Sequence, residues 1–184
     1  EAVLAETDPN VAGALRWALA RTGDDGVAHV AAGVRSADVD VRRRAVLAVA
    51  ELPGDEATAV LVEALGDAAA TVRGHAALAL GARGLTAAVP VLVGMVVEGV
   101  NDVEAAEVLG SLSGDPECAD RVMSALVDEL AAHTADPGVR IRLIQALSEL
   151  PGTAAHGVLR DLAGDGDRAV ALVAAALLGL LEGR

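Results

Sequence analysis

The feature that most constrains this chain is a pattern that returns about every thirty residues. Its clearest copy, DVDVRRRAVLAVAELPGDEATAVLVEALGD, begins at Asp38 with an acidic start and an apolar periodic stretch. A Pro-Gly break and a second apolar stretch follow. After Val41, apolar residues fall at Ala45, Ala48 and Val49, which lie on one face of a helix. Each copy of the pattern therefore predicts two antiparallel helices joined by a turn, a helical hairpin.

Two independent markers repeat with this period, which is typical of a solenoid. Positions equivalent to Val41 are Val11, Val72, Asn101, Val139 and Val170, and the breaks fall at Gly23, Gly54, Gly84, Gly114, Gly152 and Gly183. The predicted first helices are 9–22, 39–52, 70–83, 100–113, 137–150 and 168–182. The predicted second helices are 25–35, 56–66, 87–98, 116–133 and 154–163, with residues 1–6 as the tail of another.

The pattern thus predicts an all-α solenoid of five to six hairpins that forms one domain, 1–184. Its hairpins are expected to start near residues 8, 38, 69, 98, 136 and 167. Both ends look truncated, so we expect this domain to be a fragment of a longer chain.

Acidic and hydroxyl residues mark the predicted helix starts, where a side-chain oxygen can accept from the unpaired amides of the first turn. Before the first helices these are Asp8, Asp38, Asp136 and Asp167. Before the second helices they are Asp24, Asp55, Thr86, Asp115 and Thr153. We expect all of them to cap helices.

The composition narrows the classes of protein further. More than half of the residues are apolar but only Trp17 is aromatic, so the core must be built from small side chains. Fourteen arginines, with no lysine, face 27 acidic residues, and the net charge of -13 argues against binding nucleic acid. Charged residues, Gly and Pro interrupt every apolar run before membrane-spanning length, and the single cysteine cannot form an internal disulfide. A cytoplasmic protein without a membrane partner is expected.

Three segments carry a resemblance to a known family. They are the first-helix sequences DVDVRRRAVLAVA from Asp38, ATVRGHAALALG from Ala70 and ADPGVRIRLIQAL from Ala135. The second-helix sequence AVPVL at 88–92 carries the same resemblance. The chain resembles the HEAT and HEAT-like (bilin-lyase type) repeats. The resemblance implies an armadillo-type, right-handed superhelix whose second helices line the concave face, and a protein-binding scaffold. The fourth hairpin departs from it, with Asn101 and Asp102 where Val-Arg is expected.

The resemblance also implies a structural role for one position in the first helix. Arg42, Arg73 and Arg140 stand where family members bridge neighbouring repeats to a loop aspartate, and we group Asp38 and Asp136 with them. The alternative is a ladder for an anionic ligand. Arg42, Arg43 and Arg44 form the one basic run, but three successive helix positions cannot share one face.

The residues that could carry chemistry are isolated. None of the four histidines has another His or a Cys at metal-ligand spacing, so we predict no metal, cofactor or catalytic site and no enzyme. The alternative, a bilin-lyase-like or other small-molecule role, rests on the family resemblance alone.

The charges are distributed unevenly between the helices. Most arginines fall in first helices, whereas the second helices and their starts carry many acidic residues that only Arg121 and Arg160 clearly answer. We therefore predict an acidic concave face that binds a basic protein partner through Glu63, Asp120, Asp128 and Asp161. The alternative is that the acids only cap helices. The apolar last helix, from Ala169 to Leu181, predicts self-association or packing onto the fifth hairpin.

Overall fold

The computed structural model describes residues 2–21 and 25–183 of the chain. The chain divides into two compact units, an N-terminal unit of residues 1–83 and a C-terminal unit of residues 84–184. We describe each unit by itself.

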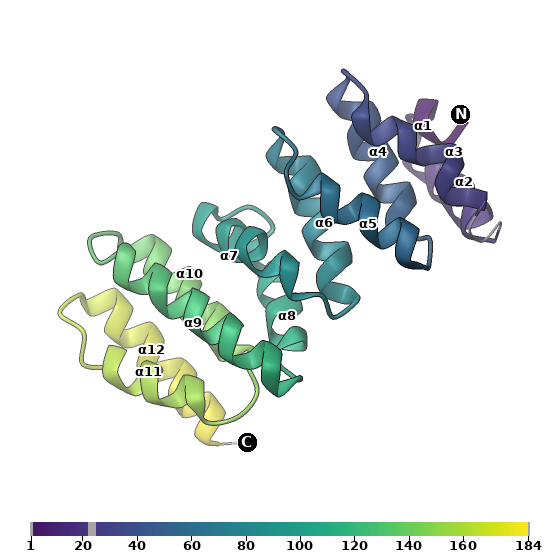
Figure 1. The fold of residues 1–184 in the computed structure, drawn as a ribbon. Helices are drawn as coiled ribbons and strands as arrows, with labels where there is room; N and C mark the ends of the chain where they lie inside the picture. The colour runs from purple at the N-terminus through teal and green to yellow at the C-terminus, as the bar shows by residue number, and fades with distance from the viewer. Residues whose placement is uncertain (1, 22–24, 184) are drawn as a thin grey trace. The chain divides into compact units, whose positions relative to one another are not determined.

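Antiparallel helices build the N-terminal unit (Figure 1). In chain order they are α1 (Ala2–Ala5), α2 (Pro9–Ala20), α3 (Asp25–Val30), the 3-10 segment η1 (Ala31–Arg35), α4 (Val39–Ala50), α5 (Asp55–Ala64) and α6 (Ala70–Ala82). Helix α4, the first helix of its hairpin, packs against α6, η1 and α5. Gly33 lies so close to Leu4 that an added Cβ would come within 2.8 Å of the leucine side chain.

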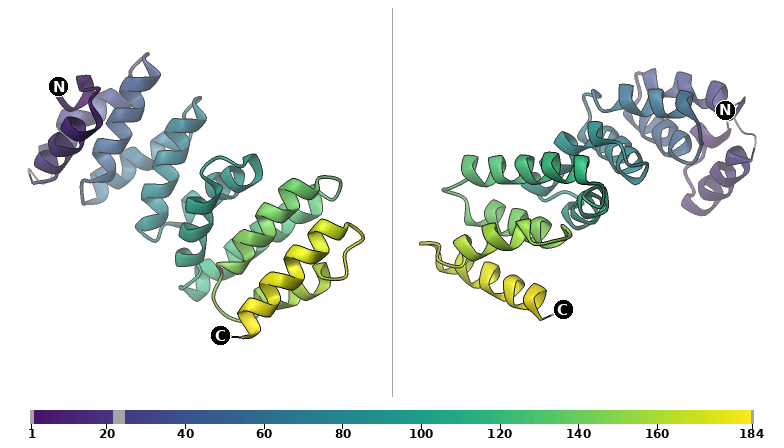
Figure 2. Two further views of the ribbon diagram at one scale, coloured as in Figure 1. Left: turned by 180° about the vertical axis from the view of Figure 1, so that it is seen from behind. Right: turned by 60° about the horizontal axis from the view of Figure 1, so that its bottom comes forward.

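The C-terminal unit continues the same pattern. Its elements are η2 (Thr86–Ala88), α7 (Val89–Glu98), α8 (Asp102–Leu112), α9 (Pro116–Ala132), α10 (Pro137–Ser148), α11 (Ala154–Leu162) and α12 (Arg168–Glu182). The first helix α10 packs between α8 and α12, while α9 packs against α7 and α10. The second helices α9 and α11 face the viewer in Figure 1, and the first helices α10 and α12 face the viewer in the left view of Figure 2. The unit therefore has a first-helix layer and a second-helix layer.

The predicted fold class is confirmed: the described chain is all-α and consists of helical hairpins. Several first helices end one or two residues earlier than predicted. Leu52 and Leu150 lie just beyond helix ends, where their amides still donate to the carbonyls of Val49 and Leu147 at 3.0 and 3.2 Å, and both residues are buried. The apolar pattern therefore continues beyond the end of the helix, which is why the predicted helices are too long.

The predicted caps of the first helices are confirmed. The side chains of Asp8, Asp38, Asp136 and Asp167 each accept from amides of the first turn.

The caps predicted for the second helices were mostly wrong. Asp115 caps α9, but Gly54 stands at the cap position of α5, which makes Asp55 the first helical residue. Gly54 has φ 96°, a conformation that glycine adopts readily, so the turn fixes where α5 starts. Thr86 begins η2, Thr153 makes no side-chain capping bond, and Asp24 lies outside the described residues.

The core of each unit consists of leucine, valine and alanine side chains. In α10, Leu143, Ile144 and Leu147 are fully buried. Small residues let the helices approach closely: a Cβ added at Gly110 of α8 would lie 2.6 Å from the backbone oxygen of Glu149. None of the helices within the described residues is both long enough and apolar enough to cross a bilayer.

Candidate functional site

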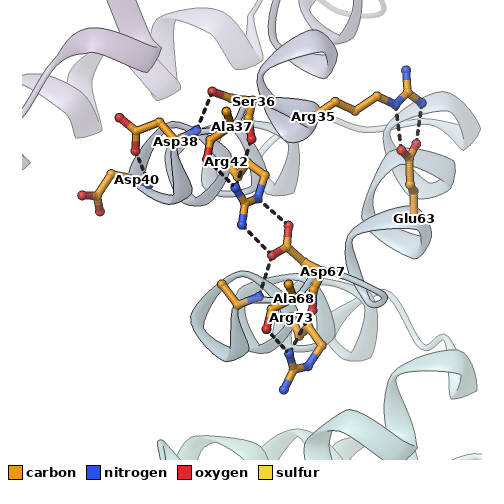
Figure 3. A network of polar contacts seen from close by, with 11 residues as sticks. Arg35, Ser36, Ala37, Asp38, Asp40, Arg42, Glu63, Asp67, Ala68 and Arg73 are labelled. Carbon is orange, nitrogen blue, oxygen red and sulfur yellow. Dashed lines mark hydrogen bonds and ion pairs between the residues drawn. The ribbon is translucent and has the colours of Figure 1, made fainter.

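An arginine in α4 connects its hairpin to the loop that leads into the next one. The Nε and Nη2 of Arg42 donate to the carboxylate of Asp67 at 2.7 and 3.0 Å (Figure 3). Its Nη1 donates to the carbonyls of Ser36 and Ala37. Asp67 also accepts from the amide of Ala69, directly before α6. One guanidinium therefore holds together the loops at both ends of the hairpin.

The same arrangement recurs in the C-terminal unit. Arg140, which is only 9% exposed, donates through Nη1 and Nη2 to the carboxylate of Asp165. Asp165 accepts from the amide of Asp167 at 2.8 Å, just as Asp67 does from Ala69. Each arginine stands 25 residues before its aspartate, so the contact follows the repeat.

The other residues grouped with these arginines take different places. The side chains of Asp38 and Asp136 cap α4 and α10, and the loop partners are instead Asp67 and Asp165, which the sequence analysis did not single out. The Nη1 of Arg73 donates to the carbonyls of Asp67 and Ala68, in the loop before its own helix (Figure 3).

These contacts predict how stability depends on acid. The hydrogen bonds from Arg42 and Arg140 lower the pKa of Asp67 and of Asp165 below the ordinary value of 3.8. A carboxyl whose pKa is lower in the folded state stabilises the fold above the unfolded-state pKa, and this contribution is lost as the pH falls through the folded-state pKa. We therefore expect unfolding free energy to drop below about pH 4.

The substitutions Asp67→Asn and Asp165→Asn should flatten this decline, because the asparagine cannot titrate. Urea unfolding followed by circular dichroism between neutral and acidic pH measures the effect. Asp55→Asn, at an exposed helix start, is the control, and a decline equally steep in all variants would contradict the assignment.

Other arginines also form intramolecular hydrogen bonds. Arg83 is partly buried, which lowers the pKa of its guanidinium, and it donates to the carbonyls of Val49, Ala50 and Leu52 at the end of α4. Arg142 donates to the carbonyls of Val96 and Val97 at the end of α7. These guanidinium groups add donors to carbonyls at helix ends, where intrahelical hydrogen bonds are incomplete.

The four acidic residues predicted to bind a partner fall in different surroundings. Glu63 of α5 lies in the N-terminal unit and forms an exposed ion pair with Arg35, 2.6 Å from Nη2 to Oε2, which lowers the pKa of Glu63 (Figure 3). Asp120 and Asp128 of α9 and Asp161 of α11 are exposed in the C-terminal unit. Within the described residues their carboxylates form no hydrogen bond or ion pair. Their role in binding stays a prediction.

Two surface hollows adjoin first helices and are lined by other residues than these four. In the C-terminal unit, Val103 of α8, Gln145 and Glu149 of α10 and Leu177 of α12 are among the residues that line a hollow of about 290 Å³. Beside it, Leu180 of α12 is 65% exposed. Self-association through α12 stays a prediction, which a monomeric mass at every concentration in light scattering would contradict.

A second hollow, of about 410 Å³, lies in the N-terminal unit between α2 and α4. Arg16 of α2 and Arg43 and Arg44 of α4 line it together with Glu6 and Asp40. The sequence analysis excluded one shared face for the run at 42–44, and Arg42 indeed contacts Asp67 instead. It missed that Arg43 and Arg44 meet Arg16, which comes from another hairpin. In the part of the chain that the structure describes, no group of His, Cys, Asp or Glu is placed to hold a metal ion.

The repeated hairpins, the two-layered packing and the arginine contacts at a fixed spacing define an α-helical repeat protein. A scan against family models matches HEAT repeats over residues 27–113. Residues 27–113 carry HEAT repeats, as their sequence indicated, and such repeats generally serve as scaffolds for protein interactions.

Two solved structures are similar to this chain. One is an engineered protein with 22% identity and a TM-score of 0.51, covering 98% of this chain and 94% of that one. The other is the complex of CpcE and CpcF of phycocyanin lyase from Nostoc sp. PCC7120, with 19% identity and a TM-score of 0.53. That match covers 94% of this chain and 72% of that chain. At these identities the likeness shows the fold alone. A comparison with curated proteins finds no significant match.

Proposed function

We propose that the chain is a protein-interaction module whose C-terminal unit binds a basic segment of a partner protein. The proposed surface consists of Asp120 and Asp128 on α9 and Asp161 on α11, and we call it the acidic second-helix surface. Glu63 is left out of this surface because it lies in the other unit and already pairs with Arg35.

The observation that carries the proposal is how the C-terminal unit uses its charges. Residues 84–184 include fifteen acidic residues and six arginines. Four of these arginines donate to other groups of the same unit: Arg121 to Thr86, Arg140 to Asp165, Arg142 to carbonyls and Arg160 to Glu182. The carboxylates of the acidic second-helix surface have no such partners within the described residues, so their charge remains available to a ligand.

Free carboxylates at a protein surface attract a basic partner over several ångströms, but they contribute little to the binding of a neutral one. At physiological salt such attraction is screened over about 8 Å, so binding should weaken as salt rises. Complementary charge of this kind mainly raises the association rate and the discrimination between partners. A basic segment, rather than an apolar one, therefore fits this surface.

The test is an affinity pull-down with wild-type chain and with Asp120→Asn, Asp128→Asn and Asp161→Asn combined, washed at increasing salt. We expect a basic protein that wild type retains, that salt releases and that the triple variant captures at least about tenfold less well, because charge-assisted hydrogen bonds are lost. The matched control is Glu104→Gln, Glu107→Gln and Glu149→Gln combined, which removes as much charge from exposed positions on α8 and at the end of α10.

Equal capture by both triple variants would contradict the proposed surface. The other hypothesis, handling of a bilin or another small molecule, has the fold likeness to a phycocyanin lyase complex in its favour. A chromophore that accompanies the purified chain, with no protein released by salt, would favour that hypothesis instead.

A further inference from the structure

The arginines around the hollow between α2 and α4 have fewer hydrogen-bond partners than the best-connected arginines of the chain. Arg42, Arg83 and Arg142 each donate to two or more acceptor groups. Arg16 donates to none among the described residues. Within the same described ranges, the guanidinium of Arg43 has one polar partner, Asp40, at 3.3 Å. These guanidinium groups therefore have donors to spare.

Arg44, the third arginine of the hollow, is held in place by one end of its guanidinium. Its Nε donates to the carbonyl of Leu4 at 2.6 Å, and its two Nη atoms have no partner among the described residues. All three arginines are partly buried and line the same hollow, so the protein supports the stems of their side chains.

The acidic residues that line the hollow do not use up these donors. Oε1 of Glu6 accepts from the amides of Thr7 and Asp8, both at 2.8 Å. Oδ1 of Asp40 accepts the long contact from Arg43. Three guanidinium groups thus face two carboxylates, in a chain whose net charge is -13.

We propose that this hollow binds a small oxyanion ligand, a molecule that carries phosphate or carboxylate groups. The planar guanidinium fork pairs two N–H donors with two oxygens of such a group, which makes arginine the side chain best suited to it. The volume of about 410 Å³ falls in the range of roughly 300–1,000 Å³ that is usual for ligand pockets, so the ligand can be larger than a single phosphate. Pro9, Ala12 and Leu47 offer apolar contact for its carbon skeleton.

This site is independent of the acidic second-helix surface, since it lies in the other unit and has the opposite charge preference. Calorimetric titration of the whole chain with pyrophosphate and with citrate, at low chloride, tests it. Binding of pyrophosphate indicates a phosphate-bearing ligand, and binding of citrate alone indicates a polycarboxylate. Both outcomes support the site provided that the arginine substitutions described next weaken the binding.

The decisive variant is Arg16→Gln combined with Arg43→Gln. Among the described residues Arg16 has no hydrogen-bond partner to lose and Arg43 has one weak partner, so the fold should persist, which circular dichroism verifies. We expect affinity to fall at least about tenfold, since hydrogen bonds to a charged group are lost. The matched control, Arg21→Gln with Arg35→Gln, removes the same charge from exposed positions of the same unit and should leave affinity unchanged.

Three results would overturn the proposal. One is equal weakening in the control, which would make the effect general electrostatics. Another is no binding of either anion. The third is binding of a polyglutamate peptide but of neither small anion, which would make the hollow a contact for an acidic protein segment.

Discussion

Leu143→Ala is expected to lower the unfolding free energy of the C-terminal unit by about 2–5 kcal/mol. Leu143 is fully buried in α10, the helix that packs between α8 and α12, so its removal leaves a cavity that rigid neighbours cannot fill. For a unit of this size the melting temperature should fall by roughly 10 °C or more. Far-UV circular dichroism during thermal and urea unfolding measures the loss.

The matched control is Leu180→Ala. It removes the same atoms from a side chain of α12 that is 65% exposed, and it should change the unfolding free energy by less than about 0.5 kcal/mol. Similar losses in the two variants would mean that α10 is not the centre of this core.

Gly110→Ala and Gly94→Ala should change stability in opposite directions. In a helix, alanine is favoured over glycine by about 0.8–1.0 kcal/mol. At Gly94 of α7 an added Cβ meets no atom within 4 Å, so this gain should appear as increased stability. At Gly110 of α8 the Cβ would lie 2.6 Å from the backbone oxygen of Glu149, and a net loss of about 1–3 kcal/mol is expected because the helices must separate.

The comparison needs only urea unfolding of three chains under one condition. Because both substitutions carry the same intrinsic helix preference, the difference between them reports the close approach of α8 to the end of α10. Increased stability in both variants would show that α8 and the end of α10 are farther apart than in this structure.

The fold could be predicted because local signals repeat. The spacing of apolar residues after Val41 and its equivalents fixes the buried face of each first helix, and the aspartates at 8, 38, 136 and 167 fix where these helices begin. Both are properties of short segments, so they need no knowledge of packing. The second helices were predicted less well at their starts, where a glycine turn such as Gly54 decides the boundary instead of a polar side chain.

Contacts between segments were harder to predict. The position of Arg42 and Arg140 suggested a bridge to a loop aspartate, but the sequence did not show that Asp67 and Asp165 are the partners. Each of these aspartates follows a glycine at the end of its hairpin, and this repeated Gly-Asp pair was the signal in the sequence that could have identified them. The cluster of Arg16, Arg43 and Arg44 depends on two hairpins packing side by side, which no single segment contains.

The prediction of the four acidic binding residues was limited in the same way, because it too depends on contacts between segments. Charge counting placed Glu63 with Asp120, Asp128 and Asp161, because all four lie in second helices. Charge counting does not reveal that Arg35 pairs with Glu63 or that the chain divides after residue 83. Of these four residues, only the three aspartates of the C-terminal unit have carboxylates without a partner among the described residues.

The most direct test of the proposed function is a titration of the whole chain with a synthetic arginine- and lysine-rich peptide, repeated at several salt concentrations. Wild type should bind with an affinity that falls steadily as salt rises, and the combined Asp120→Asn, Asp128→Asn and Asp161→Asn variant should bind at least about tenfold more weakly. The combined Glu104→Gln, Glu107→Gln and Glu149→Gln variant should stay close to wild type. Equal weakening in the two triple variants, or binding that does not respond to salt, would contradict an acidic second-helix surface that recognises a basic partner.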